Sequence, residues 1–247
     1  MEQFLRTELL MGKDNLKKLR RASVTVIGLG AVGSFAAEAL ARSGIGCLTL
    51  IDGDKIQITN INRQLYALHS TIGKLKTEAA RERILDISPG CKVETLSVFV
   101  NSHNLNEIFE KKPDLVIDAI DSFSPKASLL EYCVKNNINV ISSMGAALKT
   151  DPSAVEICDL FETHHCGLAQ RLRKELRKCA VTGGIKCVFS RQPAEMKPLY
   201  PENLPEGTEI FEKNSVKIYG SLVTITGIFG LNLAHLALTE LLNKKEL

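Results

Sequence analysis

The chain has 247 residues, of which 45% are hydrophobic and 24% are charged, an ordinary composition for a soluble globular protein with ample length for a buried core. The formal net charge of +3 permits a local basic patch without requiring an anionic partner. Because Trp is absent and only 5% of the residues are aromatic, base-stacking platforms for single-stranded nucleic acid are not expected.

The seven cysteines are scattered and form no Cys-x-x-Cys pair. An odd, unclustered set in a chain of this size is typical of reduced cytosolic thiols, and it argues against a structural zinc site. The first twelve residues carry Glu2, Arg6 and Glu8 and contain no apolar run long enough for a signal peptide. We therefore expect a cytoplasmic protein.

The first predicted elements are a strand, a glycine turn, a helix and a second strand. Residues 23–27 are a β-branched run that stops at glycines, as a buried parallel strand does. An Ala-rich helix is predicted over residues 34–43, and a second strand over residues 48–51, ending at Asp52. The unit spans about thirty residues, which is the size of a βαβ crossover.

The same alternation continues to residue 150. We predict three further helices, over residues 74–87, 104–110 and 125–136, and three further strands, over residues 93–100, 115–117 and 139–142. Alternating elements of this kind indicate an α/β fold, Rossmann-like and doubly wound, with a mostly parallel sheet. Residues 1–150 are thus expected to be the nucleotide-binding half of a single domain.

Residues 151–247 form an extended C-terminal half with a different pattern. The predicted elements are two strands (154–157 and 186–189), a basic helix between them, a mobile loop (190–216) and a long apolar helix (221–242). The apolar segment is long enough to span a membrane, but it contains the polar residues Asn232, His235, Thr239 and Glu240. We expect a helix buried in a core or in a subunit interface, without stable membrane insertion.

The glycine turn has the sequence Gly28-Leu29-Gly30-Ala31-Val32-Gly33, which fits the G-x-G-x-x-G pattern between a strand and a helix. The glycines Gly28, Gly30 and Gly33 allow a tight turn, and the helix N-terminus offers free N–H groups to a phosphate. Asp52, nineteen residues past Gly33, can accept hydrogen bonds from ribose hydroxyls. By itself the motif favours NAD, and a purely structural turn is the alternative.

A polar loop after Asp52 changes that balance, because it reaches Arg63, and Lys76 follows thirteen residues later. A dinucleotide has only a diphosphate to balance. A triphosphate in a reaction that expels pyrophosphate needs cations along its length. The pair therefore favours ATP, although any single Arg or Lys here could be a solvated surface charge.

Five ordered motifs, counting the glycine turn, resemble the superfamily of ubiquitin-activating-enzyme-like adenylyltransferases. The other four are Asp52-x-Asp54, Asn60-x-x-Arg63-Gln64, Gly73-x-x-Lys76 and Asp118-Ala-Ile-Asp121-Ser122. The resemblance implies that ATP is used to adenylate a carboxylate.

The resemblance also implies roles for individual residues. Asp52, in the motif that it shares with Asp54, would hold the ribose. The phosphates would be contacted by Asn60, Arg63 and Lys76. Asp121 would help to position Mg²⁺ near the α-phosphate. Arg6 lies where homodimeric members of the superfamily supply an arginine finger from the partner subunit.

The second half resembles the threonylcarbamoyladenosine dehydratase branch, whose members modify tRNA. The matching stretches include Asp151-Pro152, Asp159-Leu160, Cys187-Val188-Phe189-Ser190 and the closing apolar helix, whereas residues 147–148 and 163–167 depart from the branch pattern. The branch implies that the carboxylate of threonylcarbamoyladenosine, next to the tRNA anticodon, is adenylated and then closed to a hydantoin with release of AMP and pyrophosphate. An intramolecular nucleophile needs no catalytic thiol, and we interpret Cys187 as a packed core residue.

The basic helix is a candidate for tRNA contact. Leu168, Leu172 and Leu176 are spaced to form a buried stripe. The residues expected to share an outward face and to meet backbone phosphates are Arg171, Lys174 and Lys178. The alternative is a solvated amphipathic helix.

Three other functions remain open from the sequence. The first is adenylation of the C-terminal Gly of a sulfur-carrier protein, against which the missing Cys-x-x-Cys pairs argue. The others are an NAD-dependent oxidoreductase and a non-catalytic nucleotide sensor. The family implies a homodimer, and a sulfur-relay protein is a possible further partner.

Overall fold

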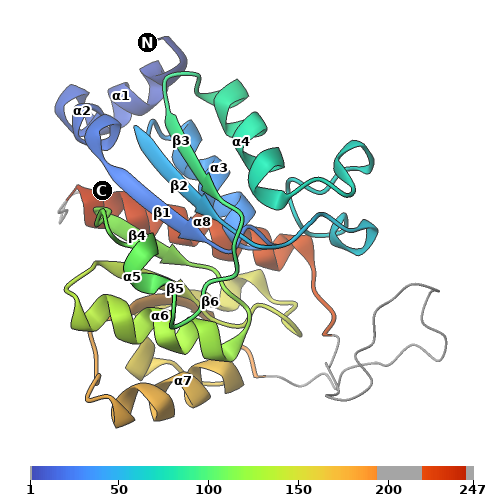
Figure 1. The fold of residues 1–247 in the computed structure, drawn as a ribbon, viewed down its shortest axis with the longest axis vertical. Helices are drawn as coiled ribbons and strands as arrows, with labels where there is room; N and C mark the ends of the chain where they lie inside the picture. Colours follow the sequence, from blue (N-terminus) through green and yellow to red (C-terminus); the bar gives the residue numbers. More distant parts are fainter. Residues whose placement is uncertain (1, 194–218, 243–247) are drawn as a thin grey trace.

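In the computed structural model, which describes residues 2–193 and 219–242, a single seven-stranded sheet runs through both halves of the chain (Figure 1). The strand order is β3-β2-β1-β4-β5-β7-β6, and every neighbouring pair is parallel except the edge pair of β6 and β7. The strands are β1 (Ser23–Ile27), β2 (Cys47–Ile51), β3 (Lys92–Leu96), β4 (Leu115–Asp118), β5 (Val140–Ser143), β6 (Val155–Asp159) and β7 (Lys186–Ser190). This confirms the predicted mostly parallel α/β class.

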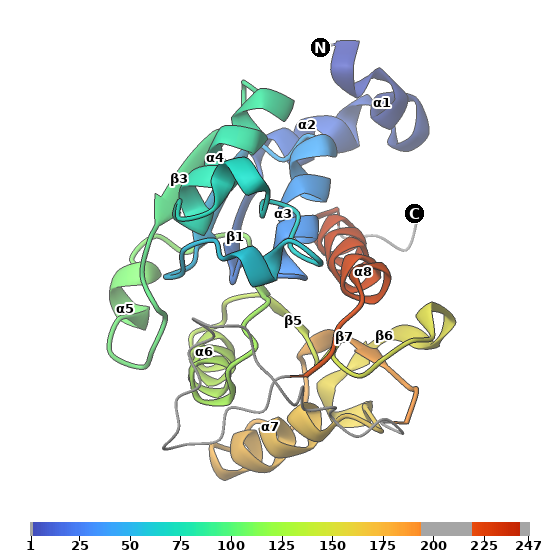
Figure 2. The same ribbon diagram turned by 90° about the vertical axis from the view of Figure 1, so that its right-hand side faces the viewer.

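Helices cover both faces of the sheet (Figures 1 and 2). The described α-helices are α1 (Leu5–Met11), α2 (Lys13–Arg21), α3 (Gly33–Arg42), α4 (Lys76–Ile87), α5 (Leu105–Ile108), α6 (Phe123–Lys135), α7 (Gly167–Lys178) and α8 (Val223–Leu241). One apolar cluster joins α3, α4 and α8 to one face, and a second joins α5, α6 and α7 to the other. Neighbouring residues of a strand alternate between the two clusters, as the pleat requires: Val26 belongs to the first and Ile27 to the second.

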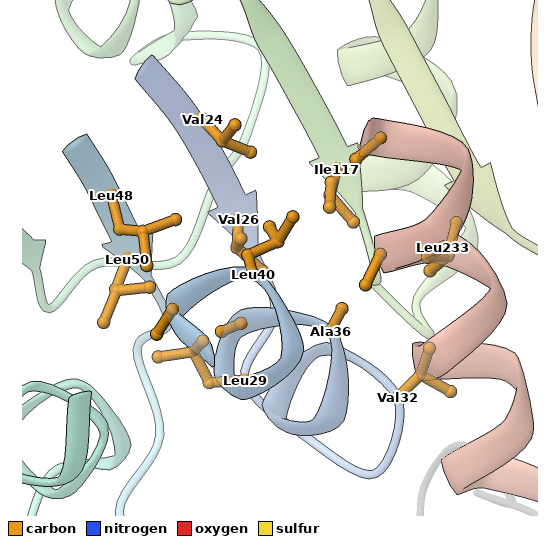
Figure 3. Close-up of a cluster of buried hydrophobic side chains, with 14 of the residues drawn as sticks. Val24, Val26, Leu29, Val32, Ala36, Leu40, Leu48, Leu50, Ile117 and Leu233 are labelled. Atoms are coloured by element: carbon orange, nitrogen blue, oxygen red, sulfur yellow. The ribbon is translucent and has the colours of Figure 1, made fainter. Parts of the chain in front are cut away.

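The first core is built from β-branched and Leu side chains of the strands against small residues of α3 (Figure 3). Ala36, Ala37, Leu40 and Ala41 are fully buried, and the alanines let this helix approach the sheet closely. The Ala-rich composition that predicted the helix therefore also sets its packing distance.

The apolar helix α8 packs on α3 in this core (Figures 2 and 3). Its glycines make the contact close, because a Cβ added at Gly230 would lie 2.4 Å from the Val32 carbonyl oxygen. Among the residues that the structure describes, α8 is the one helix long and apolar enough to cross a membrane, yet half of that apolar window is buried within the molecule. The prediction of a buried helix is confirmed.

Two of the predicted boundaries that differ in the structure have a visible cause. Strand β3 ends at Leu96 rather than at Val100, because the chain turns away where the Asn104 side chain accepts from the Asn101 N–H and donates to the Phe99 carbonyl. Helix α4 begins at Lys76, because Leu75 before it is extended and pairs with Lys55. The loop predicted over residues 190–216 lies outside the described residues from 194 onward.

Candidate functional site

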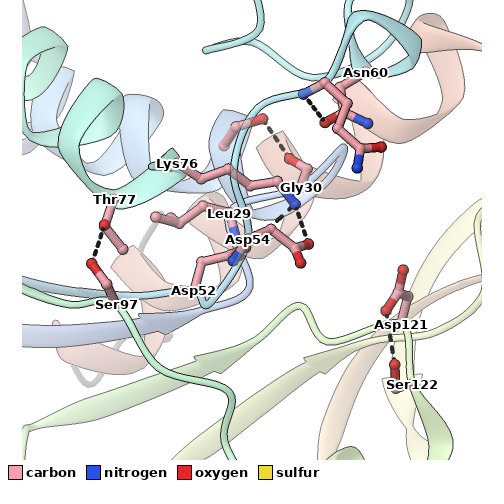
Figure 4. Close-up of polar contacts among 12 residues, drawn as sticks. Leu29, Gly30, Asp52, Asp54, Asn60, Lys76, Thr77, Ser97, Asp121 and Ser122 are labelled. Carbon is pink, nitrogen blue, oxygen red and sulfur yellow. Dashed lines mark hydrogen bonds and ion pairs between the residues drawn. The ribbon is translucent and has the colours of Figure 1, made fainter. Parts of the chain in front are cut away.

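The candidate site lies where three adjacent parallel strands end. Strands β2, β1 and β4 are neighbours in the sheet, and their carboxyl ends lead into Asp52, the glycine turn and the segment from Asp118 to Asp121. The carboxyl ends of strands in an open α/β sheet are where ligands bind. These three strand ends bring three of the five motifs to one edge of the sheet (Figure 4).

The glycine turn needs glycine at two positions for its own geometry. Gly28 has φ +88°, and a Cβ there would lie 2.7 Å from the Ala119 carbonyl oxygen. A Cβ at Gly33 would lie 1.8 Å from the Gly28 carbonyl oxygen. At Gly30, by contrast, the nearest atom is Nε2 of Gln64 at 3.7 Å. Gly30 therefore offers open backbone to a ligand, whereas Gly28 and Gly33 serve packing.

Asp52 is nearly buried and supports the turn directly. Its Oδ2 accepts the Leu29 N–H at 2.7 Å, and its Oδ1 accepts the Asp54 N–H at 2.8 Å. Burial raises the pKa of the Asp52 carboxyl above its usual value, while the Lys76 charge and the two N–H groups act in the opposite direction. Asp52, the residue predicted to bind the ribose, is therefore held in one position at the sheet edge.

Lys76 forms ion pairs with the carboxylates of Asp52 and Asp54. Its Nζ lies 2.6 Å from Asp54 Oδ2 and 3.8 Å from Asp52 Oδ1, and its side chain is only 7% exposed (Figure 4). The Lys76 ammonium group, which was expected to contact the phosphates, therefore contacts two carboxylates in this structure. Sequence spacing does not reveal this pairing, because it depends on the loop that folds back beside α4.

Asn60 and Arg63 lie on one turn near the glycine motif. The Asn60 Oδ1 accepts the Gln57 N–H at 3.1 Å, and the Arg63 Nη1 donates to the Thr59 carbonyl and to Asn62 Oδ1, both at 2.9 Å. Both side chains are tied within their own turn. Gln64, which follows Arg63, is the residue of this turn that approaches Gly30.

Asp121 is exposed on the segment that follows β4, and its side chain accepts a hydrogen bond from the Ser122 hydroxyl at 3.2 Å. Mg²⁺ is usually held by one or two carboxylates together with substrate phosphates and water. The described residues contain no group of three or more His, Cys, Asp or Glu side chains that could hold a metal ion. An accessible carboxylate such as Asp121 therefore fits a metal carried mainly by nucleotide phosphates.

Phe99 is a residue of this edge that sequence analysis missed. Its ring lies against Gly53, since a Cβ added at Gly53 would be 2.7 to 2.8 Å from three ring carbons, yet 67% of Phe99 is exposed. An exposed aromatic ring that lies against the residue after Asp52 is placed for a planar ligand group. No signal in the sequence indicated this, because Phe99 falls inside the strand predicted over residues 93–100, whereas β3 ends at Leu96.

Arg6 lies at the opposite end of the sheet from Asp121. It is exposed on α1, and the neighbouring Phe4 packs near Gly44, which precedes the start of β2. Three apolar side chains on the same short helix are also exposed: Leu5 (54%), Leu9 (78%) and Leu10 (84%). Arg6 thus cannot reach the site of its own chain.

The basic helix α7 has the predicted amphipathic arrangement. Leu172 and Leu176 are buried and Leu168 is partly buried, and the three basic residues expected on the outward face are exposed. Arg171 stacks over the Phe123 ring at 4.2 Å, which places it beside the segment that carries Asp121. Lys178 forms an ion pair with Glu175 at 2.7 Å, and Lys174 is exposed on the same helix.

Cys187 is fully buried on β7, as expected for a packed core residue. Burial raises the pKa of its thiol, which disfavours the reactive thiolate. All seven cysteines are free in this structure. The site therefore presents oxygen ligands, cations and backbone N–H groups rather than a nucleophilic thiol.

Comparison with known proteins identifies relatives of this chain. A model of the ThiF family matches residues 4–247. A tRNA threonylcarbamoyladenosine dehydratase of Bacillus subtilis is 46% identical over 77% of this chain and 75% of that protein, and one of Haemophilus influenzae is 42% identical over 94% and 90%. The Escherichia coli tRNA N6-threonylcarbamoyladenosine dehydratase, solved with ATP and also with AMP, superimposes in its ATP complex with a TM-score of 0.87 at 35% identity, over 98% of this chain and 94% of that one.

Proposed function

The chain belongs to the ThiF family, and we propose that it is an ATP-dependent enzyme that modifies tRNA. It adenylates the carboxylate of threonylcarbamoyladenosine next to the anticodon and closes the modification to its hydantoin form. The observation that supports this best is near-full-length similarity to dehydratases of this name, one of them solved with ATP and with AMP. The carboxyl-edge position of Asp52, the glycine turn and Asp121 supports the proposed nucleotide site.

In the proposed complex, ATP lies along the carboxyl edge of β2, β1 and β4. Asp52 accepts the ribose hydroxyls, the adenine stacks on Phe99, and the phosphates lie over Gly30 and the N-terminus of α3. Asn60, Arg63 and Lys76 contact the phosphates, with Asp54 holding Lys76 at the correct depth. When ATP binds, Lys76 replaces part of its contact with the two carboxylates by a contact with phosphate, because its side chain already lies at the carboxyl edge of the sheet.

Asp121 is the proposed ligand for Mg²⁺, which when bound neutralises charge on the phosphates and the leaving pyrophosphate. The substrate carboxylate oxygen attacks the α-phosphorus, and the bond to the bridging oxygen of pyrophosphate breaks. The product is an acyl-adenylate with AMP as its leaving group.

The second step needs no group from a cysteine. The ureido nitrogen of the modification attacks the activated carbonyl, loses its proton to solvent, and AMP departs with the former carboxylate oxygen. The nucleoside thereby loses one water in total. Because both groups belong to one molecule, the effective concentration of the nucleophile is on the order of 10⁵ to 10⁸ M. The buried Cys187 is consistent with this route.

The test is incubation of the protein with ATP, Mg²⁺ and tRNA that carries threonylcarbamoyladenosine. We expect AMP, pyrophosphate and a tRNA nucleoside lighter by one water in mass spectrometry. Pyrophosphate exchange that requires a small protein ending in Gly-Gly would instead establish the sulfur-carrier alternative. Binding of NAD in place of ATP would overturn both.

We further propose that α7 contacts the tRNA backbone. Replacing Arg171, Lys174 and Lys178 together with Ala is expected to weaken tRNA binding about uniformly across tRNA sequences. The slope of log affinity against log salt should also fall by about 1 for each phosphate that the helix no longer neutralises. Filter binding at several salt concentrations measures both quantities.

The matched control for the α7 variant removes three exposed charges elsewhere, at Lys92, Lys111 and Lys112. Equal effects in the two triple variants would show general attraction rather than a docked helix.

We also propose a homodimer in which Arg6 serves the site of the partner subunit. Exposed Leu5, Leu9 and Leu10 form an apolar patch on the helix that carries Arg6, and such patches are typical of interfaces. Arg6→Ala and Asp121→Ala chains should each be inactive alone. Mixed chains should recover about a quarter of wild-type activity, since half of the random dimers then hold one complete site. No recovery on mixing, with mixed dimers demonstrated, would contradict the arginine finger.

The remaining assignments follow from this function. We place the enzyme in the cytoplasm, where reduced cysteines and tRNA are found together.

A further inference from the structure

Behind the exposed Asp121 lies a fully buried ionic cluster that the proposed chemistry does not use. Asp118, the last residue of β4, and Lys126, on α6, have no exposed side-chain area, and Lys126 Nζ lies 2.6 Å from Asp118 Oδ2. The hydroxyl of Ser142, on the neighbouring strand β5, donates to the same oxygen at 2.6 Å. The other oxygen, Oδ1, accepts the Ile120 N–H at 3.1 Å.

This cluster holds the segment from Asp118 to Asp121 from both sides. The Ile120 N–H bond bends the chain immediately before Asp121, while Lys126 fixes the first turns of α6, which begins at Phe123. Ser142 adds a contact from the adjacent strand. The stretch that presents Asp121 and leads into α6 is therefore anchored at each of its ends.

Stability alone is a poor explanation for such a cluster. Two charges removed from water lose their hydration, and well-packed apolar residues of similar volume often stabilise a core at least as well. An ion pair with defined hydrogen bonds instead fixes the orientation of the carboxylate, since each oxygen of Asp118 has its own partners. Among the described residues, every buried side-chain nitrogen and oxygen has a partner, so the cluster is complete as it stands.

We propose that Lys126 and Ser142 are positioning residues for adenylation, which act through Asp118 to fix the orientation of Asp121. The inference rests on the proposed function for the role of Asp121. Neither residue touches the nucleotide in this assignment, because both are buried beneath the segment. Their effect is on how well the Asp121 carboxylate is placed rather than on the number of ligands at the site.

The test uses Ser142→Ala, which removes one hydrogen bond without leaving the buried lysine unpaired. The matched control is Ser143→Ala, since Ser143 is the next residue of β5, is also buried, and donates to the Met144 carbonyl rather than to Asp118. We expect Ser142→Ala to lower kcat about 10- to 100-fold with KM for ATP nearly unchanged, as small misplacements of a reacting group do. Ser143→Ala should keep wild-type kcat, and Ser142→Thr should restore most of the loss because it keeps a hydroxyl.

Two further measurements separate positioning from a loss of stability. In an Asp121→Asn background, Ser142→Ala should cause almost no additional loss of kcat, because both changes act through one carboxylate. The Mg²⁺ concentration that half-saturates ATP binding, measured by calorimetry without tRNA, should rise several-fold in Ser142→Ala but not in Ser143→Ala. Equal kcat in the two serine variants, or losses that simply add in the double variant, would overturn the proposal. A wild-type protein that binds Mg·ATP but does not modify tRNA would refute the proposed function, while the Mg²⁺ measurement would still decide the positioning role.

Discussion

Replacing Asp121 with Asn is expected to lower the rate of acyl-adenylate formation by about 100- to 1,000-fold, a loss comparable to removing other groups that stabilise a developing charge. The change keeps the size of the side chain and removes its charge. Because Asp121 is exposed and is bonded only to the neighbouring Ser122 hydroxyl among the described side chains, stability should change by no more than about 0.5 kcal/mol. The expected result is a folded protein that binds ATP and reacts very slowly.

Rapid quenching of single-turnover reactions measures the rate of this step, and thermal unfolding measures stability. A suitable control is Asp14→Asn, because Asp14 is an exposed carboxylate on α2 that pairs with Lys17, far from the glycine turn. If Asp121→Asn reacted within about threefold of wild type, a difference of under 1 kcal/mol in barrier, Asp121 would have no part in the chemistry.

The second large effect is expected for Lys76→Met, which should weaken both ATP binding and the fold. The variant leaves the buried Asp52 and the half-exposed Asp54 without their cation. Removing one partner of a fully buried pair costs about 3 to 5 kcal/mol, and the exposure of Asp54 reduces this to about 2 to 3 kcal/mol. ATP affinity should fall by about 100-fold, since the phosphates also lose a charge-assisted hydrogen bond.

The loss of stability in Lys76→Met should depend on pH. Burial already raises the pKa of Asp52 above that of an unfolded chain, so keeping Asp52 ionised is a cost that is present above the folded-state pKa. Lys76 opposes that rise, and its removal moves the pKa further upward. The deficit relative to wild type should therefore be largest at pH values above the raised pKa and shrink as the pH falls through it.

Urea unfolding of both proteins across this pH range gives the difference directly. Lys74→Met is a close control, because Lys74 lies two residues earlier and pairs with Glu82, with both side chains largely exposed. A deficit for Lys76→Met that stays constant with pH would mean that Asp52 does not sense Lys76.

The elements that the sequence predicted well are those set by local composition. The β-branched run before the glycines and the alanines after them are sufficient for β1, the turn and α3, because strand burial and helix approach both follow from side-chain size. The same holds for α7, whose leucine spacing gives one buried face. Both cases need no information from distant parts of the chain.

Features that depend on distant contacts were not predictable in this way. The apolar residues Val98 and Phe99 continue the pattern of β3, but Asn104 bonds to the backbone and ends the strand earlier. The pairing of Lys76 with Asp54 depends on a loop that returns beside α4. Motif spacing found the residues of the site, while their mutual distances, and the stacking of Arg171 on Phe123, required the fold.

The packing of α8 on α3 has a consequence for synthesis on the ribosome. Helix α3 follows the glycine turn and is translated early, whereas α8, which covers it, is translated after every strand of the sheet. Until α8 emerges, the apolar side of α3 around Val32 and Phe35 stays uncovered on the nascent chain. Contacts between segments so far apart in sequence form slowly. Partly translated chains should therefore expose this apolar surface until the last helix is complete, which makes them prone to aggregation.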